Sequence, residues 1–211
     1  MRLIAFLLLA TLLDAQTIQL GIRGGLRLTG DLAGQRTDAT SESKRYILGP
    51  MVVVRLPWRT SIEFDALYSR LGYRESLSYI GGFSSSRYRA HSWEFPFLIR
   101  KSLQRGMYLG AGYSPRRITG MSHSVSVIYD PLAPNPNYNF FEGDSSYSAW
   151  SKITHGIVGV AGFESRWGRL TLAPEVRYTR WTSPAIDLNG PHGYSLQSTQ
   201  DQVLVLLGIS F

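Results

Sequence analysis

The sequence predicts an all-β fold: an eight-stranded antiparallel up-and-down transmembrane β-barrel with a filled polar lumen. Three observations predict it: an amphipathic strand at the carboxy terminus, an apolar leader at the amino terminus, and eight alternating segments joined by loops of alternating length. Successive side chains of a β-strand point to opposite faces, so a period of two marks a strand with one apolar face. In a barrel wall that face meets lipid and the other meets the lumen.

The carboxy-terminal segment 201–211 has an apolar side chain at every second position and ends on an aromatic residue. The apolar set comprises Val203, Val205, Leu207, Ile209 and Phe211. A core strand of a soluble sheet also alternates, but it seldom ends a chain on phenylalanine. We interpret this segment as the closing strand of an outer-membrane barrel, with Phe211 as its assembly signal.

The amino terminus is typical of a secretory signal peptide, because Arg2 precedes an apolar run from Leu3 to Leu13 and then Asp14-Ala15-Gln16. The run is shorter than the roughly 20 apolar residues of an anchoring helix. We expect a signal peptide over residues 1–15, a barrel domain over residues 16–211, and export to the bacterial outer membrane. The chain has no cysteine, so the sequence predicts neither disulfides nor a lipidated cysteine.

Composition supports a sheet that is apolar on one face only. The chain has 21 Gly, 12 Tyr and 5 Trp with a mean hydropathy of −0.08, whereas helical spans would raise that value. Read in steps of two, eight strands follow: Ile18–Thr29, Tyr46–Leu56, Ser61–Tyr73, Tyr88–Lys101, Met107–Thr119, Lys152–Ser165, Arg169–Thr182 and Gln202–Phe211. Each reaches the length of about 9 to 11 residues that a tilted spanning strand needs.

The connections alternate between tight and long. Tight turns are expected at Pro57–Arg59, Ser102–Arg105 and Arg166–Gly168, and long polar loops at Gly30–Arg45, Arg74–Arg87, Gly120–Ser151 and Ser183–Asp201. Short periplasmic turns and long extracellular loops are typical of outer-membrane barrels, and an even strand number returns both termini to the periplasm.

Charged residues fall on the inner faces of these strands. They include Arg23, Arg27, Arg55, Arg100 and Arg177, and the acids Glu63, Asp65, Glu94 and Glu175. An eight-stranded barrel is just wide enough for side chains to fill it, and a buried charge is costly unless paired. We expect a near-neutral network that closes the lumen. An active site or ion path built from the same carboxylates is the alternative. The sixth strand is ambiguous, since Val158 and Val160 compete with Ile157 and Phe163 for its apolar face.

Several segments resemble the PorT-like outer-membrane β-barrel family. They are Ser61–Gly72, Trp93–Lys101, Gly106–Tyr113, Gly156–Glu164 and Leu170–Tyr178. The resemblance implies an outer-membrane location and an eight-strand architecture. The namesake branch of the family is associated with protein secretion, and the resemblance implies no catalytic residues.

The four histidines are His91, His123, His155 and His192, and no two of them have the spacing of metal ligands. The segment His192–Ser195 is faintly similar to the His/Ser pair of lipid A deacylase barrels, but no carboxylate completes a triad in the expected position. The acidic loop residues Asp130, Glu142 and Asp144 lack the pattern of a cation-binding loop. We therefore predict no catalytic residue, no cofactor and no metal.

The net charge of +7 is concentrated at the two rims. Arg59, Lys101, Arg105, Arg166 and Arg169 lie at the tight turns beside Trp58 and Trp167, and Arg70, Arg74, Arg87, Arg89, Arg116, Arg117 and Arg180 lie near the opposite rim. Outer-membrane lipids and lipopolysaccharide are the expected partners of these cations. A solvated basic rim without a specific partner is the alternative, and export argues against nucleic acid.

The longest loop is rich in aromatic residues, including Tyr129, Tyr138, Phe140 and Phe141. Such a loop can bind a partner or pack over the barrel mouth. We expect a non-catalytic barrel with a structural or adhesive role, or an accessory of an envelope or secretion complex, inserted by the barrel assembly machinery. The alternatives are a narrow channel or small-ligand transporter, a lipid-modifying enzyme, and a soluble lipocalin-like barrel with an apolar interior.

Overall fold

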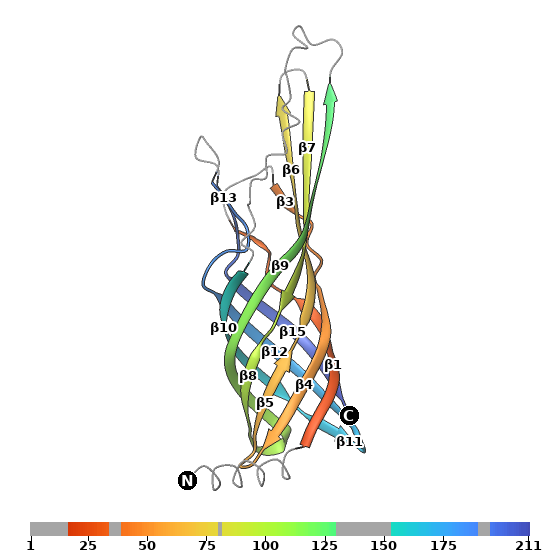
Figure 1. The fold of residues 1–211 in the computed structure, drawn as a ribbon, viewed down its shortest axis with the longest axis vertical. Coiled ribbons are helices and arrows are strands. Elements are labelled where there is room, and N and C mark those ends of the chain that lie inside the picture. The colour runs from red at the N-terminus through yellow and green to blue at the C-terminus, as the bar shows by residue number, and fades with distance from the viewer. Residues whose placement is uncertain (1–16, 34–38, 80–81, 130–152, 190–194) are drawn as a thin grey trace, which may run out of the picture.

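The computed structural model of the chain is a closed antiparallel barrel with one group of strands that continues beyond it (Figure 1). It describes residues 17–33, 39–79, 82–129, 153–189 and 195–211, and the predicted signal peptide lies outside these ranges. The predicted fold class is confirmed. In the part of the chain that the structure describes, no helix is both long enough and apolar enough to cross a membrane.

The barrel is built from eight strands or pairs of consecutive strands, each of which we call a wall, and they follow one another around the barrel in chain order. They are β1 (Thr17–Arg27), β4 (Tyr46–Leu56), β5 (Thr60–Asp65) with β6 (Leu67–Tyr79), β7 (Gly82–Glu94) with β8 (Phe97–Ser102), β9 (Met107–Tyr129), β10 (Ile153–Phe163), β12 (Leu170–Trp181) and β15 (Asp201–Ser210). The last wall pairs with the first, with Ile209 opposite Ile22, and this pairing closes the sheet.

The third and fourth walls are each interrupted once, which the period of two does not reveal. The breaks lie at Ala66 and at Phe95-Pro96, where the proline has no N–H to donate. Backbone hydrogen bonds nevertheless cross both breaks. The Asp65 amide donates to the Pro96 carbonyl at 3.1 Å, and the Ala66 amide donates to the Pro50 carbonyl at 3.0 Å. Each pair of strands therefore acts as one wall.

The boundaries expected for two long loops are wrong. Strand β6 continues to Tyr79, β7 already begins at Gly82, and β9 runs to Tyr129, so these three strands rise together above the barrel (Figure 1). The run Ser84-Ser85-Ser86 in β7 gives no alternating signal, whereas in the upper part of β9 Ser122, Ser124 and Ser126 do alternate with His123, Val125 and Val127. The third tight turn also shifts, because β11 (Ser165–Trp167) pairs with β12 and leaves Gly168-Arg169 as the turn.

The described parts of the other long connections lie at the mouth of the barrel. Strands β13 (Asp187–Asn189), β14 (Ser195–Ser198) and β2 (Leu32–Ala33) form a small second sheet, and β3 (Ala39–Ser41) pairs with β6. An apolar cluster joins this cap to the inner face of the rising strands: Leu71, Tyr73, Ala90, Ile118, Ala185 and Ile186. At the opposite end, a short 3-10 helix, η1 (Gln104–Gly106), forms the turn between β8 and β9.

The two faces of the walls differ as the alternation predicts. Apolar side chains such as Leu20, Phe64 and Ile157 are exposed on the outside, and Trp58 and Trp167 are exposed at the tight turns. The ambiguous sixth strand is resolved as β10. Its Val158 and Val160 point inward and pack with Leu98 and Tyr108, whereas Ile157 and Phe163 point outward.

Inward-facing glycines allow the walls to approach one another closely. A Cβ added to Gly112 on β9 would lie 1.9 Å from the Phe97 carbonyl oxygen, whereas one added to Gly159 on β10 would have no atom within 4 Å. We expect Gly112→Ala to destabilise the barrel by at least about 1–3 kcal/mol, the usual cost of overpacking. Urea unfolding of the reconstituted barrel measures this, with Gly159→Ala as the matched control. Equal unfolding midpoints for the two variants would contradict the packing argument.

Candidate functional site: the charged lumen

The central lumen holds six charged side chains that come from four walls. They are Arg23 on β1, Glu63 and Asp65 on β5, Arg100 on β8, and Glu175 and Arg177 on β12. All six are almost completely buried, and Arg23, Glu63 and Asp65 are 0% exposed. We call this set the central cluster. It contains three cations and three carboxylates, so its formal charge is zero.

Two guanidinium groups connect the three acids of the central cluster. Nη1 of Arg23 contacts Glu63, lies 2.9 Å from Oδ2 of Asp65 and 3.7 Å from Oε1 of Glu175. Nη2 of Arg177 lies 2.9 Å from Oε1 of Glu63, 2.9 Å from Asp65 and 2.7 Å from Glu175. Each carboxylate therefore contacts both cations, as a buried charge requires.

Neighbouring side chains orient the members of the central cluster. Nη1 of Arg100 lies 2.6 Å from Oε2 of Glu63, and its guanidinium stacks 4.4 Å from the centre of the Tyr108 ring. The Tyr108 hydroxyl in turn donates to Oε2 of Glu175 at 2.9 Å. Removing one member of such a buried set typically costs about 3–5 kcal/mol, because its partners keep their charge without compensation.

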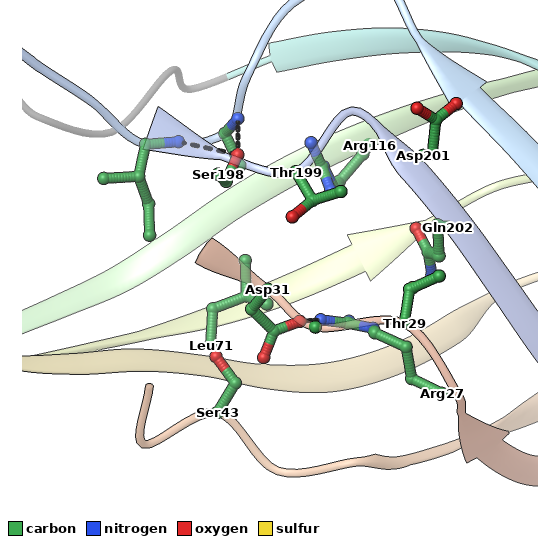
Figure 2. A pocket seen from close by; sticks show the side chains of 13 residues that line it. Arg27, Thr29, Asp31, Ser43, Leu71, Arg116, Ser198, Thr199, Asp201 and Gln202 are labelled. Atoms are coloured by element: carbon green, nitrogen blue, oxygen red, sulfur yellow. Dashed lines mark hydrogen bonds and ion pairs between the residues drawn. The ribbon is translucent and has the colours of Figure 1, made fainter. Parts of the chain in front are cut away.

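A second charged group lies toward the mouth (Figure 2). Arg27 forms an ion pair with Asp31, and its Nη2 donates to Oγ of Ser69 at 3.4 Å. Beside this pair is a cavity of about 20 Å³, which is enough for about one water molecule. Above the cavity the Ser198 hydroxyl accepts a bond of 2.6 Å from the Ala185 amide and so fixes the cap.

Near Arg27, a further group of buried side chains is arranged around the Trp181 ring. The Arg116 guanidinium lies 3.9 Å above the Trp181 ring, and its Nε donates to Oγ1 of Thr154 at 2.9 Å. Nε1 of Trp181 donates to Oε1 of Gln202 at 2.7 Å, and Nε2 of Gln202 donates to Oε1 of Glu94 at 3.2 Å. Gln202 thus links the Trp181 indole to the Glu94 carboxylate through hydrogen bonds.

A third group lies at the end of the tight turns. Arg55 forms an ion pair with Glu164 and donates from Nη2 to Oε1 of Gln19 at 3.0 Å. Arg166 approaches the same carboxylate to 3.5 Å. Charged pairs therefore occupy the lumen from one end to the other.

The structure thus divides the single expected network into three groups. Arg23, Glu63, Asp65, Glu175 and Arg177 meet in the central cluster. Arg27, Arg55 and Glu94 instead contact Asp31, Glu164 and Gln202. The pairing differs because contacts across a lumen depend on the stagger between strands, which the alternation within one strand does not contain.

The expectation that Arg116 belongs to the basic rim is wrong, because this residue lies inside the barrel and is only 4% exposed. The alternation of β9 could have located it. Tyr108 and Ser114 share its inward face, whereas Leu109 and Tyr113 are exposed. Trp181 and Gln202 were not expected as binding partners, although both also lie on inward positions of their strands.

The remaining predicted residues are Phe211 and the aromatic residues of the longest loop. Phe211 follows the closing strand: its amide donates to the Leu20 carbonyl at 3.0 Å and its side chain is 73% exposed. Tyr129 ends β9, but its side chain and all of Tyr138, Phe140 and Phe141 lie outside the described residues. The assigned partner loop therefore stays a prediction.

The described histidines lie on the outer surface. Nδ1 of His91 is 2.6 Å from the Tyr68 hydroxyl, and His155 makes the same type of contact with Tyr113. His192 and the side chains of His123 and Ser195 are not described. Within the described residues, no group of three or more His, Cys, Asp or Glu side chains has an arrangement that could hold a metal ion.

No protein-family model matches the chain, and a sequence comparison with curated proteins finds no match, so the PorT-like resemblance stays a prediction. The fold is similar to the crystal structure of Neisserial surface protein A, with 12% identity over 93% of this chain and 97% of that one and a TM-score of 0.46. It is also similar to the outer membrane protein OprG of Pseudomonas aeruginosa, with 9% identity, coverage of 92% and 93%, and a TM-score of 0.45. A third similar structure is Ail, the attachment invasion locus protein of Yersinia pestis, solved in complex with the heparin analogue sucrose octasulfate. Its identity is 9% over 93% of this chain and 97% of that one, and the TM-score is 0.32. The small closed barrel is described by the strand pairings themselves.

Proposed function

We propose that this chain is a non-catalytic outer-membrane barrel whose lumen is closed to solutes and whose role is structural, adhesive or accessory to an envelope or secretion complex. The observation that carries the proposal is the central cluster. Its three carboxylates, on β5 and β12, all contact both Arg23 and Arg177, and all of these side chains are almost completely buried. Acids used in this way hold the walls in place and are not free to act as bases or to carry ions.

The outer surface supports a membrane location. Exposed apolar side chains cover all of the walls, for example Leu20, Phe97, Leu109 and Val176. Trp58 is 87% exposed at the tight turns, and an aromatic residue suits the level of the lipid headgroups. A soluble lipocalin-like barrel would reverse this pattern, because its ligand cavity would be apolar and its exterior polar.

The rising strands give the proposed accessory role a surface. Strands β6, β7 and β9 continue outward together, and the aromatic segment of residues 130–152 follows directly from β9. A partner in an envelope or secretion complex, as the PorT-like resemblance implies, would meet this part of the chain first. Contact with barrel assembly machinery would instead involve Phe211 at the opposite end.

In planar bilayers, we expect the unmodified barrel to show no steady openings, because the charged groups and packed apolar residues fill the lumen. Single-channel recording of the reconstituted protein measures this. Reproducible ion-selective openings would replace the closed barrel with the narrow channel as the proposed function.

Arg177→Ala should both destabilise the barrel and increase leak, because it removes a cation that three buried acids share. The expected loss of stability is about 3–5 kcal/mol. Arg180→Ala is the matched control, since Arg180 lies on the same strand and pairs with Asp201 at the exposed surface. Urea unfolding and bilayer recording are the measurements. If both variants behave alike, the central cluster does not close the lumen.

Phe211→Asp should slow assembly in the membrane, because it places a charge on the terminal residue of the closing strand. The control is Phe163→Asp, which makes the same change on an exposed position near the same end of β10. The folded fraction is followed by the heat-dependent shift in gel migration after pulse labelling. Equal assembly rates would show that Phe211 has no special role.

A further inference from the structure

A basic pocket lies on the outward face of the strands, outside the lumen and beyond the barrel wall. Its cationic lining consists of Lys44, Arg70, Arg87 and Arg89, and its volume is about 510 Å³. We call this the outer basic pocket. It shares no residue with the central cluster, so the closed lumen does not explain it.

Strand register places these residues side by side. Arg70 is opposite His91 and Gly72 is opposite Arg89 in the β6–β7 pairing. The Lys44 amide donates to the Arg70 carbonyl at 2.9 Å, which aligns the segment after β3 along the same edge. Residues opposite one another in a ladder point to the same face, so the cations converge on one surface.

The strands pack closely at the centre of this surface, where Gly72 is buried. Gly72 lies between Arg70 and Arg74 on the outward face of β6, and a Cβ there would lie 2.9 Å from the Tyr88 carbonyl oxygen. A side chain at position 72 would therefore push β6 away from β7, the two strands that carry Arg70 and Arg89.

One carboxylate organises one side of the outer basic pocket. Oε1 of Glu42 lies 2.6 Å from Nη2 of Arg74, and Oε2 lies 2.8 Å from Nε of Arg87. No described residue forms an ion pair with Lys44, Arg70 or Arg89. Like charges held this close create a positive potential that favours an anion.

The height of the outer basic pocket identifies the source of the anion. Tyr68 and Trp93 form an aromatic pair with ring centres 5.3 Å apart on the same outward face. A strand rises about 3.3 Å per residue, so Arg70 begins about 7 Å beyond Tyr68, and Arg89 about 13 Å beyond Trp93. Aromatic belts lie at the level of the lipid headgroups, so cations that follow the belt along the strands stand at and just beyond that level, within reach of headgroup phosphates.

We propose that the outer basic pocket binds a phosphate group on the sugar headgroup of an outer-leaflet glycolipid. Arg70 and Arg89 contact the phosphate, since guanidinium groups bind phosphate oxygens in a bidentate manner, and Glu42 positions Arg87 beside it. The inference rests on the proposed outer-membrane location and adds a specific lipid site to it.

The test compares Arg70→Gln/Arg89→Gln with Arg105→Gln/Arg169→Gln, which removes two exposed cations at the opposite end. Labelled diphosphorylated lipid A is titrated against the folded full chain in mixed micelles, and fluorescence anisotropy gives Kd. We expect the first variant to bind roughly 30-fold more weakly, because each exposed cation near such headgroups contributes roughly a fivefold factor. The second variant should bind like the unmodified protein.

Two further arms identify the ligand. Lipid A without its phosphates should bind the unmodified protein as weakly as the first variant binds the complete lipid. A soluble glucosamine phosphate should not displace labelled lipid A at equal phosphate concentration. Displacement would assign the pocket to a free anion and overturn the lipid proposal, as would equal affinities for the two double variants.

Gel migration with and without heating shows that each variant is folded, and bilayer recording on the same samples keeps the proposals separable. A folded, non-conducting barrel whose lipid affinity ignores Arg70 and Arg89 refutes the outer basic pocket alone. Failure of the unmodified chain to insert into bilayers refutes the membrane location itself.

Discussion

Charge neutrality inside a narrow cylinder is the constraint on which the rest of this structure depends. An eight-stranded barrel has room for side chains but little for water, so each inward charge must find a partner across the lumen. Arg23 on β1 and Arg177 on β12 meet this requirement by contacting the same three acids, two on β5 and one on β12. The inward alternation and the small glycine positions are both compatible with that arrangement.

Much of the architecture could be predicted from local pattern alone. Alternation is a property of single strands, so eight walls, their outward apolar residues and the inward positions of Glu63, Asp65 and Arg177 follow from the sequence. The pairing partners do not, because they depend on how far each strand is staggered against the next. Arg27 and Arg55 therefore pair with acids that lie outside the expected set.

The rising strands were missed for a different reason. Alternation is clear where one face of a strand is apolar, and it is lost in the run Ser84-Ser85-Ser86 of β7. Residues 82–89 still pair with residues 122–129 in a ladder, although Ser122, Ser124 and Ser126 of β9 do alternate with His123, Val125 and Val127. The alternation likewise does not reveal the break at Phe95-Pro96. Proline has no N–H to donate, but the Pro96 carbonyl still accepts a hydrogen bond from the neighbouring strand.

The lumen contacts also have a mechanical meaning. Ladder hydrogen bonds join each wall only to its two neighbours, so a barrel held by ladders alone can flatten into an oval cross-section. The central cluster runs between β1, β5, β8 and β12, and the stacking of Arg116 on Trp181 spans β9 and β12 across the intervening β10. Most of these contacts connect strands that are not neighbours in the sheet and so resist such flattening. A barrel braced in this way resists flattening of its cross-section, and β6, β7 and β9 extend beyond the barrel from that braced base.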